Sequence, residues 1–262
     1  MAVDGVIKDW PGRIEALEAM SRYPKKLRYI GNPALIRRPR VSIVGSRRPL
    51  AYTKQTIFAL SVALAKRGVS VVSGAAMGVD AVAHQGAGAA DTIAVLPCGL
   101  AHRYPAVNAR LIESIAKKGL LLSQFDDDFK ARPWSFVVRN EIVVALGEVL
   151  VVGEADRDSG TMRSVEYAKK MGRPIFVLPH RLGESEGSND LLRKGEAEAI
   201  WDVEAFADRF GSVDLKEEED DLILFCRGNP TYEEAARRFG ARLFEAELEG
   251  KIAVKEGRII LL

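Results

Sequence analysis

The stretch best suited to chemistry is Gly45-Ser46-Arg47-Arg48, which directly follows the apolar run 41–44. A glycine turn at a strand end exposes backbone N–H groups, and an arginine fork can bind a phosphate through two hydrogen bonds. Turns that bind a dinucleotide carry more glycines, as G-x-G-x-x-G, so that the backbone itself approaches the pyrophosphate. Because side chains fill that space here, the turn favours an external phosphodiester, although both arginines could simply begin a loop. The sequence also lacks G-x-x-x-x-G-K-[ST], which argues against a P-loop that hydrolyses NTP.

Two further loops carry similar residue types. The stretch 73–80 reads SGAAMGVD, and the stretch 156–161 reads DRDSGT. Glycines and helix starts of this kind again offer N–H groups to an anion. Asp80 and His84 are four residues apart, which would place them on one helical face, and we interpret them as bracing the loop rather than performing chemistry.

The elements that must position these loops alternate along the chain. Nearly continuous Val, Ile and Leu runs are typical of parallel strands buried on both faces, and amphipathic patterns between them predict helices. This alternation predicts an α/β fold with a Rossmann-like, doubly wound, mostly parallel sheet, in which ligands bind at the carboxyl ends of the strands. The expected strands are 41–45, 69–74, 92–97, 120–125, 148–153 and 174–179, and the expected helices are 52–67, 78–90, 106–118, 136–147 and 161–171.

Positive charge is concentrated near the N-terminus. Residues 21–54 contain ten Arg and Lys residues and no Asp or Glu. Such asymmetry indicates a polyanionic partner, although a solvated basic face would give the same pattern.

Several stretches, in order along the chain, resemble the DNA-processing protein A family, also called DprA or Smf. The resemblance implies a Rossmann-like protein that binds single-stranded DNA through its phosphate backbone, without catalysis and without a cofactor or metal. It further implies protection of incoming DNA, loading of the RecA recombinase during natural transformation, and a homodimer. The match covers about residues 24–195, and its main motifs read VSIVGSRRP, VVSGAAMGVDAVAH, IAVLPCGL, GLLLSQF, RPWSFVVRNEIVVALGEVLVV and DSGTMRSVEYAKKMGRPIFVLP.

The resemblance also implies which residues bind DNA, with Arg47 as the principal cation. Some relatives carry a cation where this chain has Pro133, so either Arg132 or Lys130 is expected to replace it. Phe136 or Trp134 could stack on a base, and each is also plausible as ordinary core. The full expected set is Gly45, Ser46, Arg47, Arg48, Ser73, Gly74, Gly78, Asp80, Lys130, Arg132, Phe136, Arg139, Asn140, Ser159, Gly160 and Thr161.

The expected organisation has four parts. They are an N-terminal extension (1–39), the Rossmann-like DNA-binding domain (40–210), an acidic linker (211–221) and a winged-helix-like module (222–262). The module contains a capping box, Thr231 and Glu234, and a hairpin that turns at Glu256-Gly257. Its seven Arg and Lys residues nearly balance its six Glu residues, which favours protein contact or regulation over duplex binding.

Other classes of protein and site are weakly supported. No apolar run approaches the roughly 20 residues that span a bilayer, and no secretory signal is evident, so we expect a cytoplasmic protein. Cys98 and Cys226 are far apart, which argues against a disulfide framework or zinc site. Asp126-Asp127-Asp128 could bind Mg²⁺, but a solvated acidic loop fits better.

Two alternative functions remain open. A LOG-type (lysine-decarboxylase-like) nucleoside monophosphate phosphoribohydrolase has a similar sheet and carries GGxGTxxE. The corresponding loop here, DSGTMRSVE, lacks one glycine and carries Glu166 two positions late. A metabolite-binding Rossmann regulator is the other alternative.

Overall fold

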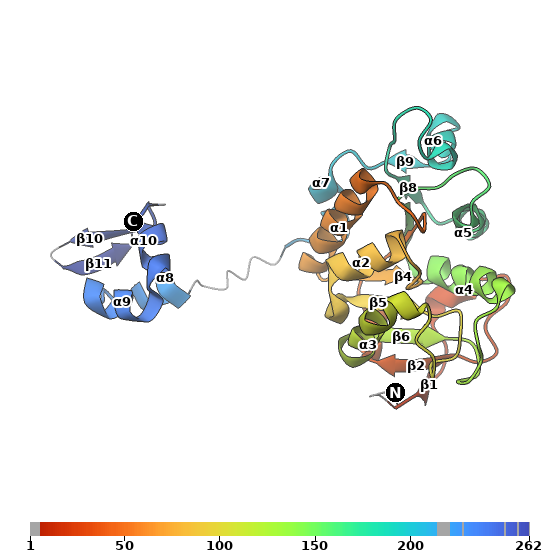
Figure 1. Cartoon of the computed structure of the whole chain (residues 1–262), viewed down its shortest axis with the longest axis horizontal. Coiled ribbons are helices and arrows are strands. Elements are labelled where there is room, and N and C mark those ends of the chain that lie inside the picture. Colours follow the sequence, from red (N-terminus) through yellow and green to blue (C-terminus); the bar gives the residue numbers. More distant parts are fainter. Residues whose placement is uncertain (1–5, 214–220, 227, 249, 256, 262) are drawn as a thin grey trace. The chain divides into compact units, whose positions relative to one another are not determined.

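The computed structural model describes residues 6–213, 221–226, 228–248, 250–255 and 257–261. The chain divides into two compact units, Met1–Val213 and Asp214–Leu262. The first unit contains a nine-stranded sheet, and the second contains three helices and a hairpin (Figure 1).

The sheet of the first unit has the order β1-β2-β6-β5-β4-β3-β7-β8-β9. The chain builds outward from β3 through β4, β5 and β6 on one side, then returns to the other side of β3 with β7, β8 and β9. All pairs from β6 to β9 are parallel. The predicted doubly wound, mostly parallel sheet is therefore confirmed, with its switch point between β3 and β7. These strands are β3 (Arg40–Val44), β4 (Ser70–Ser73), β5 (Thr92–Val95), β6 (Leu120–Ser123), β7 (Val149–Val152), β8 (Ile175–Val177) and β9 (Glu198–Ala199).

Helices cover both faces of this sheet, and alternate residues of each strand point to opposite helix layers. Val41 and Ile43 of β3 pack in the core beneath α1 and α2, whereas Val44 packs in the core beneath α4 and α5. One layer comprises α1 (Ala51–Lys66), α2 (Val79–Ala87), α3 (Ala109–Lys118) and α7 (Val203–Ala207). The other comprises α4 (Pro133–Leu146), α5 (Gly160–Lys170) and α6 (Glu186–Arg193).

Two helix starts differ from the expected ones by three residues, and the other three differ by one. Helix α4 begins three residues early, because Pro133 suits the first helical position and the Ser135 hydroxyl bonds the backbone of Arg132. Helix α3 begins at Ala109, after a short 3₁₀ turn, η4 (Ala106–Asn108), that follows Pro105.

The N-terminal segment adds two antiparallel strands to the sheet. Strand β2 (Arg28–Gly31) pairs with β6, and β1 (Lys8–Asp9) pairs with β2. The amphipathic pattern of residues 9–23, DWPGRIEALEAMSRY, predicts a helix, but only the 3₁₀ helix η1 (Glu15–Ala19) forms there. Pro11 and Gly12, whose φ is +76°, prevent an earlier start. A second 3₁₀ helix, η2 (Pro33–Arg37), precedes β3.

The second unit consists of α8 (Asp221–Cys226), α9 (Tyr232–Phe239), α10 (Ala241–Leu248) and the hairpin β10 (Ile252–Lys255) and β11 (Arg258–Leu261). The capping box is confirmed: Thr231 Oγ1 accepts from the Glu234 amide, and a Glu234 carboxylate oxygen accepts from the Thr231 amide at 3.0 Å. Gly257 has a φ of +74°, as the expected turn requires, while Glu256 lies outside the described residues. That this unit is a winged helix stays a prediction. None of the helices in the described parts of the chain is long and apolar enough to cross a membrane.

Candidate functional site

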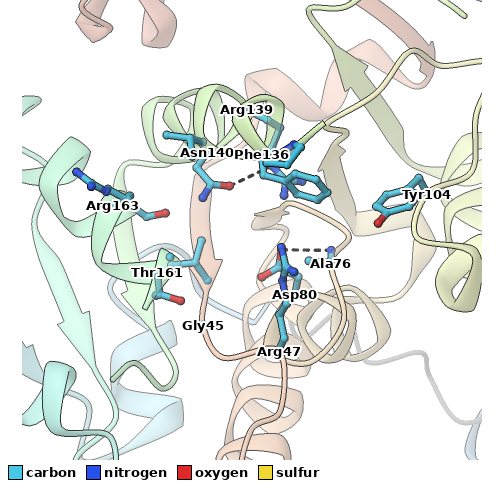
Figure 2. A pocket seen from close by; sticks show the side chains of 15 residues that line it. Gly45, Arg47, Ala76, Asp80, Tyr104, Phe136, Arg139, Asn140, Thr161 and Arg163 are labelled. Carbon is cyan, nitrogen blue, oxygen red and sulfur yellow. Dashed lines mark hydrogen bonds between the residues drawn. The ribbon is translucent and has the colours of Figure 1, made fainter. Parts of the chain in front are cut away.

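A cavity of about 410 Å³ lies at the switch point, where β3 ends and the N-termini of α4 and α5 meet. Figure 2 shows Phe136, Arg139 and Asn140 reaching in from α4, with Thr161 on α5 and Tyr104 on another side. The structure thus brings the three sequence-predicted loops to one rim. Eight predicted residues line the cavity: Gly45, Arg47, Asp80, Phe136, Arg139, Asn140, Gly160 and Thr161.

The loop after β3 is fixed from both sides. The Ser46 amide donates to the Glu154 carbonyl at 2.9 Å, and the Ser46 carbonyl accepts from the Val79 amide at 3.1 Å. The Leu50 amide donates to the Glu154 carboxylate at 2.8 Å. This backbone network leaves the Arg47 side chain exposed at the cavity mouth, with its guanidinium carbon 5.3 Å from the centre of the Phe136 ring.

Gly78 is required where the second loop, residues 73–80, crosses the loop that follows β3 and carries Arg47. Its φ is +80°, which favours glycine, and a Cβ there would lie 2.2 Å from the Ser46 carbonyl oxygen and 2.7 Å from the Arg47 Cα. No side chain fits at this crossing, so Gly78 lets the two loops touch.

A buried Arg139 holds the second loop from beneath. The residue is only 3% exposed, and its Nη1 donates to the Gly74 and Val95 carbonyls, the latter at 2.6 Å. Asp80 accepts from the Gly74 and Ala76 amides at 3.2 and 3.3 Å. Burial lowers the pKa of Arg139 to about 10, so the guanidinium is charged at neutral pH. Burial raises the pKa of Asp80, and the positive charge of Arg139 opposes that rise.

His84 braces the same loop. The Thr92 hydroxyl donates to the Val71 carbonyl, so at 2.6 Å it must accept from His84 Nδ1–H. His84 Nε2 is then free to accept from the Ala75 amide at 3.3 Å. Burial lowers the pKa of His84 to about 3, which keeps the ring neutral. The loop includes Ala75 at a φ of +55°, a conformation that needs such support.

The N-terminus of α5 faces the cavity through Gly160 and Thr161. The backbone amides of its first turn and its helix dipole favour an anion. Ser164, one turn along the helix, is fully buried and lines the cavity, and its hydroxyl has no hydrogen-bond partner in the parts of the chain that the structure describes. The hydroxyl of Ser159, the residue before α5, is likewise buried and unpaired there. A bound oxyanion would satisfy such groups.

Aromatic rings form the opposite wall. Phe136 is half-buried and meets Tyr104 edge to face, with ring centres 5.9 Å apart. Trp134 is 50% exposed and packs against Phe125 and Phe129 instead, outside the cavity lining. Phe136 is therefore the ring placed to stack on a planar group in the cavity.

Several predicted residues lie away from the cavity lining. Pro133 lines the wall, but Arg132 and Lys130 do not, and both are exposed. Arg48 is exposed on the outer side of its loop, and its amide donates to Ser46 Oγ. Ser73 is buried and donates to the Ile43 carbonyl at 2.6 Å. The lining excludes Ser46, Ser73, Gly74, Gly78 and Ser159, which support the loops around it.

Sequence reasoning missed three polar or aromatic residues of the lining, Tyr104, Arg163 and Ser164. The signal for the last two was the helical spacing from Gly160, since positions three and four residues apart share one face. The guanidinium of Arg163 points away from the cavity (Figure 2). It pairs with Glu166 at 3.2 Å. Glu166 is the carboxylate that corresponds to the glutamate of the phosphoribohydrolase motif. In this structure it forms an ion pair with Arg163 and does not line the cavity.

The acidic loop considered for Mg²⁺ is occupied by ion pairs. Asp126 accepts from Lys26 at 2.7 Å, and Asp127 accepts from Arg28 at 2.8 Å. Within the described ranges, no three His, Cys, Asp or Glu side chains are grouped to hold a metal ion. The loop therefore joins the N-terminal segment to the sheet.

The family model for DNA recombination-mediator protein A matches residues 6–211 of the chain. The chain belongs to this family. The predicted family is therefore confirmed.

Members of the DNA recombination-mediator protein A family with curated names include DprA of Bacillus subtilis (strain 168). It is 34% identical over 63% of this chain and 57% of its own length. Protein Smf of Synechocystis sp. (strain ATCC 27184 / PCC 6803 / Kazusa) is 36% identical over 68% of this chain and 45% of its own length. The chain thus spans about half the length of these relatives.

Two solved structures of the family share the fold. DNA processing protein A from Helicobacter pylori, described with its single-stranded DNA binding mode, is 40% identical with a TM-score of 0.77, and the match covers 80% of this chain and 97% of that one. DprA from Streptococcus pneumoniae is 28% identical with a TM-score of 0.72, and the match covers 80% and 75%.

Proposed function

We propose that this protein binds single-stranded DNA through the switch-point cavity, with little dependence on sequence. The observation that carries the proposal is the exposed Arg47 guanidinium at the mouth of a cavity that also contains a helix N-terminus and the Phe136 ring. A phosphate would lie at the start of α5, near the Ser164 hydroxyl, and Arg47 would bind it from the rim. A base would stack on Phe136, a contact that any base can make.

The buried predicted residues have a positioning role in this proposal. Arg139, Asp80 and His84 fix the second loop, and Gly78 lets it meet the loop that carries Arg47. Arg48 and Arg132 are exposed near the rim elements and would contact phosphates farther along the strand, with Arg132 contributing more than Lys130 because its fork suits phosphate.

The remaining expectations extend the proposal to the cell. By its resemblance to the DprA family, the chain would protect incoming DNA and load RecA during natural transformation, as a cytoplasmic homodimer without catalysis. Residues 40–210 would form the DNA-binding domain, and residues 222–262 would contact protein partners.

The deciding experiment compares the two forms of DNA. Fluorescence anisotropy at fixed salt should show tighter binding to an oligonucleotide than to the duplex of the same sequence, and similar affinity for oligonucleotides of different sequence. Equal or stronger binding to the duplex would reject the cavity as a single-strand site. Incubation with nucleoside monophosphates should release no free base, and released base would favour the phosphoribohydrolase alternative.

A further inference from the structure

A second and larger hollow, of about 820 Å³, lies at the other end of the strands. Its lining includes Arg40, the first residue of β3, whereas the switch-point cavity follows the last residue of that strand. The N-terminal segment around η1 and the 3₁₀ helix η2 form the rest of its wall. We call this hollow the arginine pocket, after Arg13, Arg37, Arg40 and Arg173, which all line it.

Positive charge in the arginine pocket is poorly balanced. Four arginines and one acidic residue, Glu15, line the pocket, and of the four Arg13 is already paired with Glu18 at 3.0 Å. Arg40 Nε donates to the Leu146 carbonyl at 2.7 Å, and Arg173 Nη2 donates to the Ala145 carbonyl at 3.0 Å, so both bind the C-terminal end of α4. The two guanidinium groups therefore stand close together.

This closeness leaves positive charge uncompensated and one Arg173 donor unsatisfied, whereas Arg40 Nη1 already donates to the Ile36 and Arg38 carbonyls, the latter at 2.8 Å. Burial lowers the pKa of Arg40, the nearby charge of Arg173 lowers it further, and Glu148 opposes both effects. Arg173 Nε is buried without a hydrogen-bond partner in the described residues. An anion bound here would relieve the repulsion and accept a hydrogen bond from Arg173.

Arg37 supplies an open cation at the edge of the arginine pocket. It is exposed at the end of η2, and it makes no ion pair with any residue that the structure describes. Trp10 lines the same pocket and packs edge to face on Tyr29, with ring centres 5.1 Å apart. Arginine donors beside an indole ring are the combination that binds a phosphate and a base of a single strand.

We propose that the arginine pocket binds a second stretch of the same single-stranded nucleic acid that occupies the switch-point cavity. This proposal rests on the proposed function. Strand β3 separates the two sites by its five residues, or about 16 Å at 3.3 Å per residue. Between them, Ser21 donates to Glu141 in the middle of α4, and its neighbour Arg22 is exposed. A strand leaving the cavity along α4 would meet Arg22 before reaching Arg37.

The test measures binding of oligo(dT) of increasing length as a function of salt. The variants are Arg37→Ala, the charge-preserving Arg37→Lys, and Arg47→Ala in the cavity. The matched control is Lys66→Ala, an exposed cation at the end of α1 in the opposite helix layer. Circular dichroism verifies that each variant is folded.

For long oligonucleotides, Arg37→Ala should reduce the slope of log affinity against log salt by about 0.7, the value for one phosphate contact on a single strand. Arg37→Lys and Lys66→Ala should keep the wild-type slope. An extended single strand is longer per phosphate than the ~3.4 Å rise of the duplex, so only an oligonucleotide with one or two phosphates is too short to reach both sites. The effect of Arg37→Ala should then vanish, while that of Arg47→Ala persists.

Wild-type affinity and slope for Arg37→Ala at every length would overturn the proposal, and would leave the cavity assignment intact. A silent Arg47→Ala together with an effective Arg37→Ala would instead reject the cavity and support the arginine pocket.

Discussion

Arg47 combines the two properties that a DNA-contacting residue needs. Its backbone is held by neighbours that bond both Glu154 and Val79, while its side chain is exposed at the cavity mouth. A fixed backbone lowers the entropy that is lost on binding, because only the side chain must be ordered.

Replacing Arg47 by Ala should weaken single-strand binding to a similar extent for every sequence, and should lower the salt slope by about 0.7. The reason is the loss of one phosphate contact that reads no base. Anisotropy titrations at several salt concentrations measure both quantities, with Lys66→Ala as the control. A folded Arg47→Ala protein with unchanged affinity would remove Arg47 from the site.

His84 makes the stability of the fold depend on pH. The pKa of the folded protein's ring is about 3, against 6.5 ordinarily. Between these pH values the His84 ring is protonated in the unfolded chain but stays neutral in the folded protein. The free energy of unfolding should therefore fall as pH falls from 6.5 toward 3. The slope from this one residue is at most about 1.4 kcal/mol per pH unit.

Urea unfolding at a series of pH values measures this effect. His84→Gln keeps an acceptor for the Ala75 amide but cannot be protonated, so its stability should decline less steeply over the same range. Thr92→Ser keeps the hydroxyl that His84 contacts and should decline as the wild type does. A wild-type slope in His84→Gln would mean that other groups cause the acid sensitivity.

At the scale of elements, the crossing of two loops at Gly78 can be tested against a matched glycine. Gly78 and Gly88 flank α2 and have similar φ values, +80° and +76°. A Cβ at Gly78 would strike the backbone of the Arg47 loop, whereas a Cβ at Gly88 would meet nothing within 4 Å. The pair therefore separates backbone strain from steric conflict.

We expect Gly88→Ala to lower the free energy of unfolding by roughly 1–3 kcal/mol, because its φ of 76° and ψ of 158° lie in a region that is essentially restricted to glycine. Gly78→Ala should cost at least about 1 kcal/mol more, since the loops must also move apart. It should weaken DNA binding because Arg47 moves, and Gly88→Ala should not. Chemical denaturation and anisotropy of the two variants give both comparisons, and equal stabilities would show that the crossing can relax.

Elements with a strong local signal were predictable from the sequence, and those that depend on distant partners were not. The nearly continuous apolar runs at β3, β4 and β7 predict buried strands, because both faces of such a strand are apolar. Strand β2 has no such run: the stretch Arg28–Gly31 becomes a strand through its pairing with β6. Local pattern also cannot reveal that Arg139 is buried beneath Gly74, because that contact joins residues 65 positions apart.

At the scale of the whole molecule, the two units should contribute unequally to DNA binding. The switch-point cavity and the arginine pocket both belong to the first unit, and affinity for a single strand depends on the number of cations that meet phosphates. Residues 214–221 contain six acidic residues and one lysine, which would repel DNA rather than attract it.

Truncation after Val213 should therefore preserve most of the affinity for single-stranded DNA, or raise it slightly. The truncated and full-length proteins are titrated at the same salt concentration, after circular dichroism confirms the fold. A loss of more than about tenfold, or roughly 1.4 kcal/mol, would mean that the second unit contacts DNA or organises an assembly that does.

The pairing of β2 with β6 has a consequence for the protein during its synthesis. Gly31 meets Leu120, which the ribosome adds 89 residues later. At a translation rate of roughly 5 to 20 residues per second, β6 is synthesised on the order of 5 to 20 seconds after β2. During that interval the nascent chain exposes the basic residues 21–54 without the aspartates that later pair with Lys26 and Arg28. Because the ribosome is itself a polyanion, we expect this basic segment to bind its surface. The segment should dissociate once Asp126 and Asp127 have been synthesised and can pair with Lys26 and Arg28.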